Sequence, residues 1–405
     1  MNISKSISFS IILVSVSSVM EWTYLPITNT YLWWGVYSWT LYIFYLHAKV
    51  VGFNNILVNF FLLLVAISFF YGAFFMTENY WDWKQLISNL MVFLLPMAAY
   101  TFNDVFVLSK TLHHWFRFAP ILLIIILPFV IYGDAIAKFL VPYTFVSLWI
   151  SSFAKKFRVF IIISYLLHLT LAFGARTDII KATYCILIGL SASFCLFRSL
   201  LYNNLIKIWI LHLFLPILFV ILGLTGTFNI FSAIDEYGSD SSYVDEKGNE
   251  VSTLGDTRSF IYVEEINSAI EHNYILFGRS MARGYESEWF GRGVDADLNL
   301  NRNERGSSEV SLLNVFNYFG LVGVFVYMLI FIIGSYKAIF KSNNSFMPLL
   351  GLFVAFRWDV AFIEDFTNFS LNYLFLWIMI GMCFSQKFRG MSENEFKLFL
   401  NKCMP

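Results

Sequence analysis

The sequence predicts an all-α polytopic membrane protein with one large, partly helical loop, and three observations lead to this fold class. Hydrophobic residues make up 58% of the chain and charged residues only 13%, against roughly 25% charged in ordinary soluble domains. Apolar stretches of about 17 to 25 residues, long enough to cross a bilayer, recur along the whole chain. A single polar interruption of 84 residues, 226–309, contains 16 acidic and 7 basic side chains. These features exclude a water-soluble protein.

About twelve apolar segments have the length of a membrane span, nine before the large loop and three after it. The first follows Lys5 as a signal peptide would, but Glu21-Trp22 stand where a small-residue cleavage site is needed, so we expect a retained anchor. The expected spans lie near 6–20, 29–48, 55–76, 86–108, 118–137, 139–154, 159–175, 179–198, 205–225, 310–336, 346–366 and 368–385. The expected organisation is therefore 1–225 for nine spans, 226–309 for the loop, 310–385 for three spans and 386–405 for a tail.

The positions of Lys and Arg predict the orientation, because cytoplasmic connections retain positive charge. With the N-terminus inside, most of the basic residues fall in cytoplasmic connections. Only Lys84, Lys138, Arg176 and Lys181 fall in the short outer ones. Both termini are then cytoplasmic and the large loop is outside.

Several functions are not indicated. The net charge is zero, which does not suggest nucleic-acid binding. The cysteines, Cys185, Cys195, Cys383 and Cys403, show neither disulfide nor zinc-cluster spacing. Only His272 of the six histidines is expected outside, which argues against a His-based metal site. Glycine-rich nucleotide loops are missing from the sequence. We expect neither a metal nor a cofactor.

The loop has two parts. Residues 227–255 are rich in Ser, Asp, Glu and Gly, which is typical of a mobile, solvated segment. Asp256 or Thr257 then caps an expected helix that runs to about His272. Its predicted apolar face consists of Phe260, Val263, Ile266, Asn267 and Ile270. A stretch dense in arginine follows, with Arg279, Arg283, Arg292, Arg302 and Arg305.

Two arginines stand where an anion could bind. Arg258 lies in the first turn of the expected loop helix, where free backbone N–H groups and a guanidinium make a site for phosphate or pyrophosphate. The alternative is an ion pair with a nearby acid such as Asp256. Arg176 lies at the outer edge of the seventh span. Interfacial arginines often only extend to the lipid headgroups. The short outer connections of this chain contain few cations, however, so an arginine there is a candidate for a functional role.

Two further positions are candidates. Glu309 lies where the chain re-enters the membrane, a place of intermediate dielectric that makes a carboxylate a stronger base. Its alternative role is that of an acid favoured by the dipole at a helix start. Arg357 and Glu364 are seven apart in the eleventh span and share a helix face. They are either functional intramembrane charges or part of a structural ion pair that holds this helix to its neighbours.

Short motifs occur in a recognisable order along the chain. These are Gly174-Ala175-Arg176-Thr177, the helical Arg258, a Phe277-Gly278 turn, and Glu309-x-x-x-Leu313 followed by Gly320-Leu321-Val322-Gly323. Their order and spacing resemble the O-antigen polymerase and O-antigen ligase superfamily. The resemblance covers most of the chain as topology, but as motif only about three short patches.

The resemblance implies a metal-independent glycosyltransferase at the periplasmic face of the Gram-negative inner membrane. Arg176 and Arg258 would hold the pyrophosphate of an undecaprenyl-pyrophosphate-linked donor and stabilise it as it departs. Glu309 occupies the place of a His that activates the acceptor in ligases, and this departure favours a polymerase of the O-antigen polymerase family. The expected substrate-binding residues are Arg279, Arg283, Arg305 and Arg357.

The expected activity joins lipid-linked oligosaccharide repeat units into a polysaccharide, with inversion at the anomeric carbon. Donor and acceptor are both linked to undecaprenyl pyrophosphate, and a chain-length regulator protein is an expected partner. Two alternatives remain at this point, a ligase of the same superfamily and a flippase for the lipid-linked repeat unit. Flippases generally show two related halves, and the large loop with nine spans before it and three after argues against one.

Overall fold

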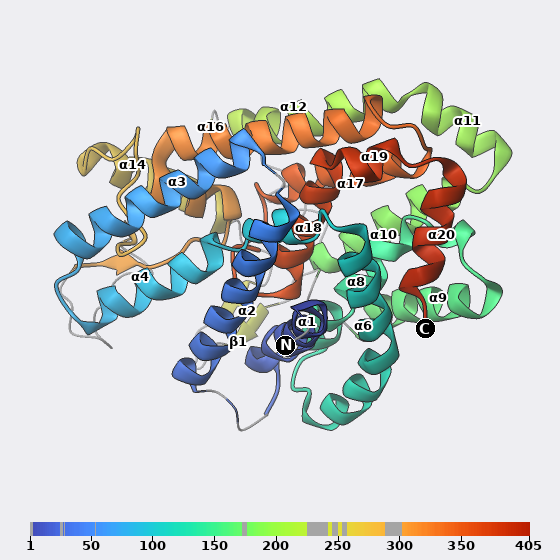
Figure 1. Ribbon diagram of the computed structural model, residues 1–405. Coiled ribbons are helices and arrows are strands. Elements are labelled where there is room, and N and C mark those ends of the chain that lie inside the picture. Colours follow the sequence, from blue (N-terminus) through green and yellow to red (C-terminus); the bar gives the residue numbers. More distant parts are fainter. Residues whose placement is uncertain are drawn as a thin grey trace.

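The computed structural model describes residues 3–24, 27, 29–52, 54–171, 176–224, 242–244, 250–252, 257–287 and 302–405. Helices dominate this described part (Figure 1), which confirms the predicted all-α class. Its strands form two short antiparallel pairs within the large loop. One joins β1 (Ser242–Val244) to β2 (Glu250–Ser252), and the other joins β3 (Tyr285–Glu286) to β4 (Glu304–Arg305).

The chain before the loop forms a series of helices joined by short connections and helical turns. They are α1 (Ile3–Ser17), η1 (Met20–Trp22), α2 (Thr30–Val51), α3 (Ile56–Tyr71), η2 (Gly72–Met76), α4 (Tyr80–Phe93), α5 (Met97–Thr101), α6 (Val105–Ile126), η3 (Leu127–Phe129), α7 (Asp134–Phe139), α8 (Val141–Ser147), η4 (Ile150–Ser152), α9 (Lys155–Leu171), α10 (Arg176–Ser191), α11 (Cys195–Asn203) and α12 (Leu205–Leu224).

The loop contributes one helix, and the remaining helices follow it. These are α14 (Thr257–Glu271) in the loop, then α16 (Ser311–Phe340), α17 (Phe346–Val360), α18 (Leu371–Phe384), α19 (Gln386–Gly390) and α20 (Glu393–Cys403). In Figure 1, α3, α16 and α12 run side by side along one edge of the molecule, with α14 near one end of α16.

Five described helices are long and apolar enough to cross a membrane, and a bent pair adds a sixth if it counts as one span. The bent pair is α10 with α11, whose axes differ by 110°. This supports a membrane-embedded, all-α protein. The five are Ile3–Trp22, Ile56–Met76, Val105–Phe129, Leu205–Leu222 and Ser311–Phe340.

Polar N-caps decide where several helices begin. Asn29, Asn55, Asn79 and Asp104 each accept hydrogen bonds from two backbone N–H groups of the helix that follows, which satisfies donors that a helix start leaves open. The cap at Asp104 corrects one expected span. The apolar run 86–108 is not one helix, because α5 ends at Thr101 and α6 starts at Val105.

The centre of the bundle is aromatic. Phe61 of α3, Tyr327 of α16 and Trp377 of α18 are fully buried, and the Phe61 ring centroid lies 5.6 Å from that of Tyr327 and 6.0 Å from that of Trp377. Between membrane helices such contacts stabilise the bundle by van der Waals packing. This core packs α3 against α16, the two helices that border the groove described below.

The C-terminal segment packs onto the bundle. In α20, Phe396 is fully buried and stacks on Phe346 of α17 with ring centroids 4.9 Å apart. The His113 Nδ1 atom of α6 lies 2.6 Å from the carbonyl oxygen of Met404. The expected tail is therefore part of the folded body.

Candidate functional site

The loop helix α14 forms where the sequence predicts it, but its buried face is not the predicted one. Val263 and Ile270 are 45% and 55% exposed, whereas Ile261, Glu265 and Ala269 are fully buried. The predicted assignment assumed that apolar side chains face the protein. A helix beside a membrane can instead turn apolar side chains outward to lipid, and the outward-facing Val263 and Ile270 fit such a position. The side chain of Phe260, also on the predicted face, lies outside the described residues.

The connection between α17 and α18, residues 361–370, gathers three helices that are distant in sequence. From α10, the Lys181 ammonium donates to both carboxylate oxygens of Glu364 at 2.9 and 2.8 Å. From α14, the Tyr262 hydroxyl donates to a carbonyl oxygen of the connection at 3.0 Å. From α16, the backbone N–H and the hydroxyl of Ser311 donate to the Glu364 carbonyl oxygen at 3.0 and 2.9 Å. Lys181 and Tyr262 are the sixth residues of α10 and α14, and Ser311 is the first residue of α16. The N-terminal halves of these three helices therefore all contact one connection.

The three predicted catalytic residues stand at the starts of these same three helices. Arg176 is the first residue of α10 and is exposed. Arg258 is the second residue of α14, and its side chain lies outside the described part of the chain, as does the proposed partner Asp256. Glu309 lies two residues before α16, whose N-cap is Val310. The motif glycine and alanine before Arg176 also lie outside the described residues.

Glu309 is paired with an arginine. The Arg305 Nη2 atom donates to the Glu309 carboxylate at 2.8 Å, and the Glu309 side chain is 46% exposed. Burial alone would lower the pKa of Arg305, but hydrogen bonds to Glu309 and Tyr285 outweigh burial and raise the pKa. Burial raises the pKa of the Tyr285 hydroxyl to about 12. Glu309 therefore precedes the first turn of α16 and sits beside a fixed positive charge.

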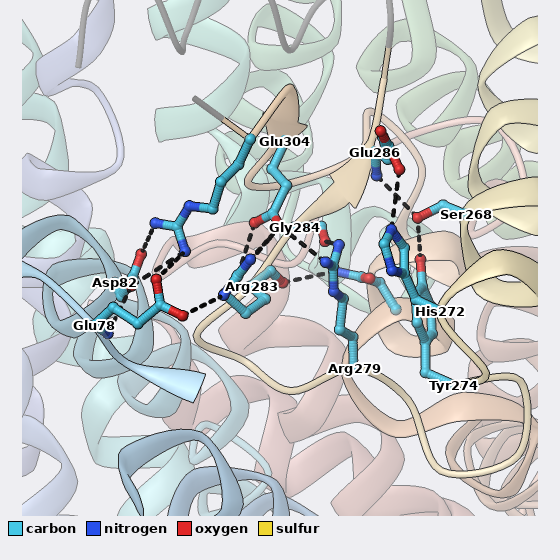
Figure 2. A network of polar contacts seen from close by, with 12 residues as sticks. Glu78, Asp82, Ser268, His272, Tyr274, Arg279, Arg283, Gly284, Glu286 and Glu304 are labelled. Carbon is cyan, nitrogen blue, oxygen red and sulfur yellow. Dashed lines mark hydrogen bonds and ion pairs between the residues drawn. The ribbon is translucent and has the colours of Figure 1, made fainter. Parts of the chain in front are cut away.

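Two of the predicted substrate-binding arginines share one carboxylate (Figure 2). Glu304 of β4 accepts from the Arg279 Nη2 atom at 2.9 Å and from the Nη2 and Nε atoms of Arg283 at 2.5 and 2.9 Å. Burial lowers the pKa of Arg279, whereas at Arg283 the hydrogen bonds to Glu304 outweigh burial and raise the pKa. Arg283 also lies 3.7 Å from the exposed Glu78 carboxylate, so both arginines have acidic partners.

The start of α4 also pairs with the arginine-rich segment. The Arg302 Nη2 atom donates to Asp82 at 2.6 Å, and the exposed Glu78 carboxylate lies 3.7 Å from Arg283 and 3.8 Å from Arg302. Figure 2 shows Glu78 and Asp82 beside Arg283 in this network. Exposed pairs such as those of Glu78 contribute at most about 1 kcal/mol. Arg292 lies outside the described residues.

Arg357 does not join this network. It is 2% exposed, donates from Nη1 to the Asn372 amide oxygen at 2.6 Å, and lies 4.5 Å from the centre of the Phe366 ring. The prediction that Arg357 and Glu364 share one helix face is wrong, because α17 ends at Val360. Glu364 pairs with Lys181 of α10, which is an ion pair to a neighbouring helix.

A break in α16 meets a turn of the loop. Gly320 has a φ of 64°, which is not helical, and Gly278 has a φ of 77°. At the break, the loop carbonyl oxygens of Ile275 and Leu276 accept from the N–H groups of residues 321 and 322 at 2.8 and 3.2 Å. A Cβ on Gly278 would lie 2.4 Å from the Phe319 nitrogen. The two glycine motifs that the sequence singled out therefore pack on each other and satisfy backbone groups that a broken helix would leave open.

An open groove of about 950 Å³ runs between α3, this turn and α16. One wall is a single face of α3, formed by Phe60, Leu63, Leu64, Ile67, Ser68 and Tyr71. The other wall contains the loop residues 272–280 and Arg283 together with Tyr318, Phe319 and Val322 of α16. Ser68 ties the walls together, because its hydroxyl donates to the Tyr318 carbonyl at 3.0 Å and accepts from the Met281 N–H at 3.1 Å.

A buried acid lies inside the loop. Glu265 of α14 is 0% exposed, and within the described part of the chain neither carboxylate oxygen has a hydrogen-bond partner. Burial raises the pKa of Glu265 well above the ordinary value of 4.5, and the charge of Arg305 offsets only part of this rise. Glu265 therefore holds its proton to higher pH than an exposed glutamate.

One group of described residues has the spacing of a metal site. Glu271, His272 and Glu286 each place one ligand atom within 4.8 Å of the others, and the His272 Nε2 atom lies 3.0 Å from the Glu286 carboxylate. Both paired side chains are 40% exposed. Exposed carboxylates of this kind are common without an ion, so the group has no assigned role. The sequence missed this proximity because β3 brings Glu286 back to the end of α14.

The sequence also missed a group of enclosed charges around Lys181. Lys181 was expected in an outer connection, but it is 3% exposed within α10 and pairs with Asp178 as well as Glu364. The spacing of Asp178 and Lys181, three apart in an apolar helix, is a signal that could have identified them. The paired acids Glu78 and Asp82 carry no such signal, because their partners are more than two hundred residues away.

No family model, no curated protein and no solved structure matches this chain.

Proposed function

We propose that this protein is a polysaccharide polymerase that joins lipid-linked oligosaccharide repeat units, with about twelve spans and the large loop on the periplasmic side of the inner membrane. The proposal rests on the motifs given by the sequence. The structural observation that supports it is the connection at residues 361–370. It accepts hydrogen bonds from Lys181 of α10, Tyr262 of α14 and Ser311 of α16. Arg176 and Arg258 stand in the first turns of α10 and α14, and Glu309 stands just before α16.

In the proposed reaction, Arg176 and Arg258 bind the pyrophosphate of the donor. A hydroxyl of the acceptor repeat gives its proton to the Glu309 carboxylate as its oxygen attacks the anomeric carbon of the donor sugar. The bond from that carbon to the pyrophosphate oxygen breaks, and the pyrophosphate leaves with the bonding electrons. Attack and departure on opposite faces invert the anomeric centre. Positive charge at the departing oxygen stabilises the transition state.

Single replacements test the proposal. Arg176→Ala, Arg258→Ala and Glu309→Ala are expressed in a strain that lacks the chromosomal copy, and surface polysaccharide is compared on gels. Removal of one preorganised electrostatic group lowers a rate by about 10² to 10³-fold. Each variant is therefore expected to leave short chains or single repeats.

The matched controls are Arg198→Ala on α11 and Glu21→Ala, since both side chains are exposed and neither lies on α10, α14 or α16. They should give chains of normal length. Normal chains from all three site variants, at normal protein level, would overturn the assignment of these residues.

A further inference from the structure

The groove beside α3 has an apolar track on one side. Its α3 residues, from Phe60 to Tyr71, recur at steps of three and four and so form one helix face. Phe60, Leu63 and Ile67 are 43%, 52% and 55% exposed, so this face is not covered by the protein. At 1.5 Å per residue the track is about 16 Å long, close to the ~15 Å of one leaflet of the hydrocarbon core.

Positive charge stands at one end of this track. Arg279 and Arg283 line the groove together with His272, and the described lining residues include no Asp or Glu. Glu304, the carboxylate that the two arginines share, does not line it. The side chains of Arg279 and Arg283 are each only 11% exposed. An anion in the groove would therefore meet two guanidinium groups in a largely desolvated place, where charge-assisted hydrogen bonds are strong.

The polar end is held in an unusual backbone conformation. Asn273 and Ser280 have φ values of 56° and 127°, and Gly278 between them has a φ of 77°. Non-glycine residues adopt such values at a cost of order 1 to 3 kcal/mol. The turn is nevertheless fixed, through the break in α16 and through Ser68. The arginines are thus presented to the groove by a rigid turn.

We infer that this groove binds a polyprenyl phosphate lipid, with its chain along α3 and its phosphate at Arg279 and Arg283. A single narrow apolar track suits one chain. Two arginines that line the groove, with no acid among the described lining residues, suit a phosphate head. The phosphate class rests on the groove alone, whereas the polyprenyl chain rests on the proposed function. A polymerase needs two lipid-linked substrates. The groove supplies a place for one that is separate from the starts of α10 and α14.

Lipid counting tests this inference without any assay of polymer formation. Polyprenyl phosphate is titrated into the purified full-length protein in detergent, and bound lipids are counted by native mass spectrometry. Arg279→Gln is expected to weaken the groove lipid by about tenfold or more. Ile67→Trp, which fills the track without touching the arginines, is expected to do the same if the chain lies along α3.

Two variants serve as matched controls. Arg302→Gln is the control for Arg279→Gln, because Arg302 belongs to the same segment and pairs with Asp82. Phe70→Trp is the control for Ile67→Trp, because Phe70 is an exposed side chain of α3. Neither residue lines the groove. Both should bind as the unaltered protein does. Unchanged binding in both Arg279→Gln and Ile67→Trp would overturn the inference.

Comparison ligands identify the source of the affinity. Polyprenol should bind at least about tenfold more weakly than its phosphate, and neither phosphatidylglycerol nor inorganic phosphate should displace the bound lipid. Equal binding of polyprenol or effective displacement by phosphatidylglycerol would contradict the inferred ligand class. If Arg176→Ala loses the bound lipid and Arg279→Gln keeps it, the result supports the proposed donor site and not the groove. If Arg279→Gln loses the lipid and Arg176→Ala keeps it, the result supports the groove and contradicts that donor site.

Discussion

Replacing Lys181 by Met tests whether the connection at residues 361–370 is held by charge. The Lys181 side chain is 4% exposed and lies 2.5 Å from the Asp178 carboxylate and 2.8 Å from that of Glu364, whose side chains are 7% and 12% exposed. Met fills a similar volume but leaves two enclosed carboxylates without their cation. Removing one partner of a buried ion pair costs about 3 to 5 kcal/mol. We therefore expect a destabilisation of this size, with loss of polymer formation because the starts of α10 and α16 separate.

Thermal unfolding of the purified protein in detergent measures the effect. Lys156→Met, at an exposed position of α9, is the control and should change stability by less than about 0.5 kcal/mol. The double variant Lys181→Met with Glu364→Gln should recover part of the loss, because one of the two uncompensated charges is gone. A midpoint for Lys181→Met equal to that of Lys156→Met would refute the role of this ion pair.

Two further predictions concern the loop. Compared with wild type, Glu265→Gln should have nearly the same free energy of unfolding at pH 4.5 and an increasingly higher one as the pH rises above 4.5. The raised pKa means that the folded protein binds a proton that the unfolded chain has released, so wild-type stability falls as pH rises from 4.5. At pH 7 the variant is expected to be more stable than wild type by at most about 3 kcal/mol, since 4.5 and 7 are 2.5 pH units apart and each unit corresponds to 1.36 kcal/mol. Equal unfolding midpoints of wild type and Glu265→Gln at pH 8 would contradict this prediction. Gly278→Ala should be more destabilising than Gly52→Ala. Both glycines have a positive φ, which costs an alanine about 1 to 2 kcal/mol at either position. Only at Gly278 would the new Cβ also collide with a backbone atom. Similar unfolding midpoints for these two variants would disprove the close packing of the turn on α16.

The sequence predicted those parts of the fold that depend on local pattern. The limits of α14 follow from a polar start and an apolar repeat, and the apolar runs give the class. The buried face of α14 was wrong because apolar periodicity does not say whether lipid or protein lies beside a helix. The division at Asp104 was also missed, although Asn103-Asp104 is a typical helix start, because the surrounding residues are continuously apolar.

The sequence proposes candidate site positions, Arg176, Arg258 and Glu309, from motif order, but it could not predict how the charged side chains pair. The sharing of Glu304 by Arg279 and Arg283 depends on the short β3–β4 pairing, which no local signal announces.

The most direct test of the central claim is the surface polysaccharide of a strain that lacks this protein. A polymerase joins repeats after they have crossed the membrane and before they reach the lipid core. Gel electrophoresis should therefore show core lipid that bears a single repeat unit, and the intact gene should restore long chains. Bare core lipid would contradict the proposal and indicate a ligase or a flippase, of which the ligase alone would leave polymer accumulated on the carrier lipid.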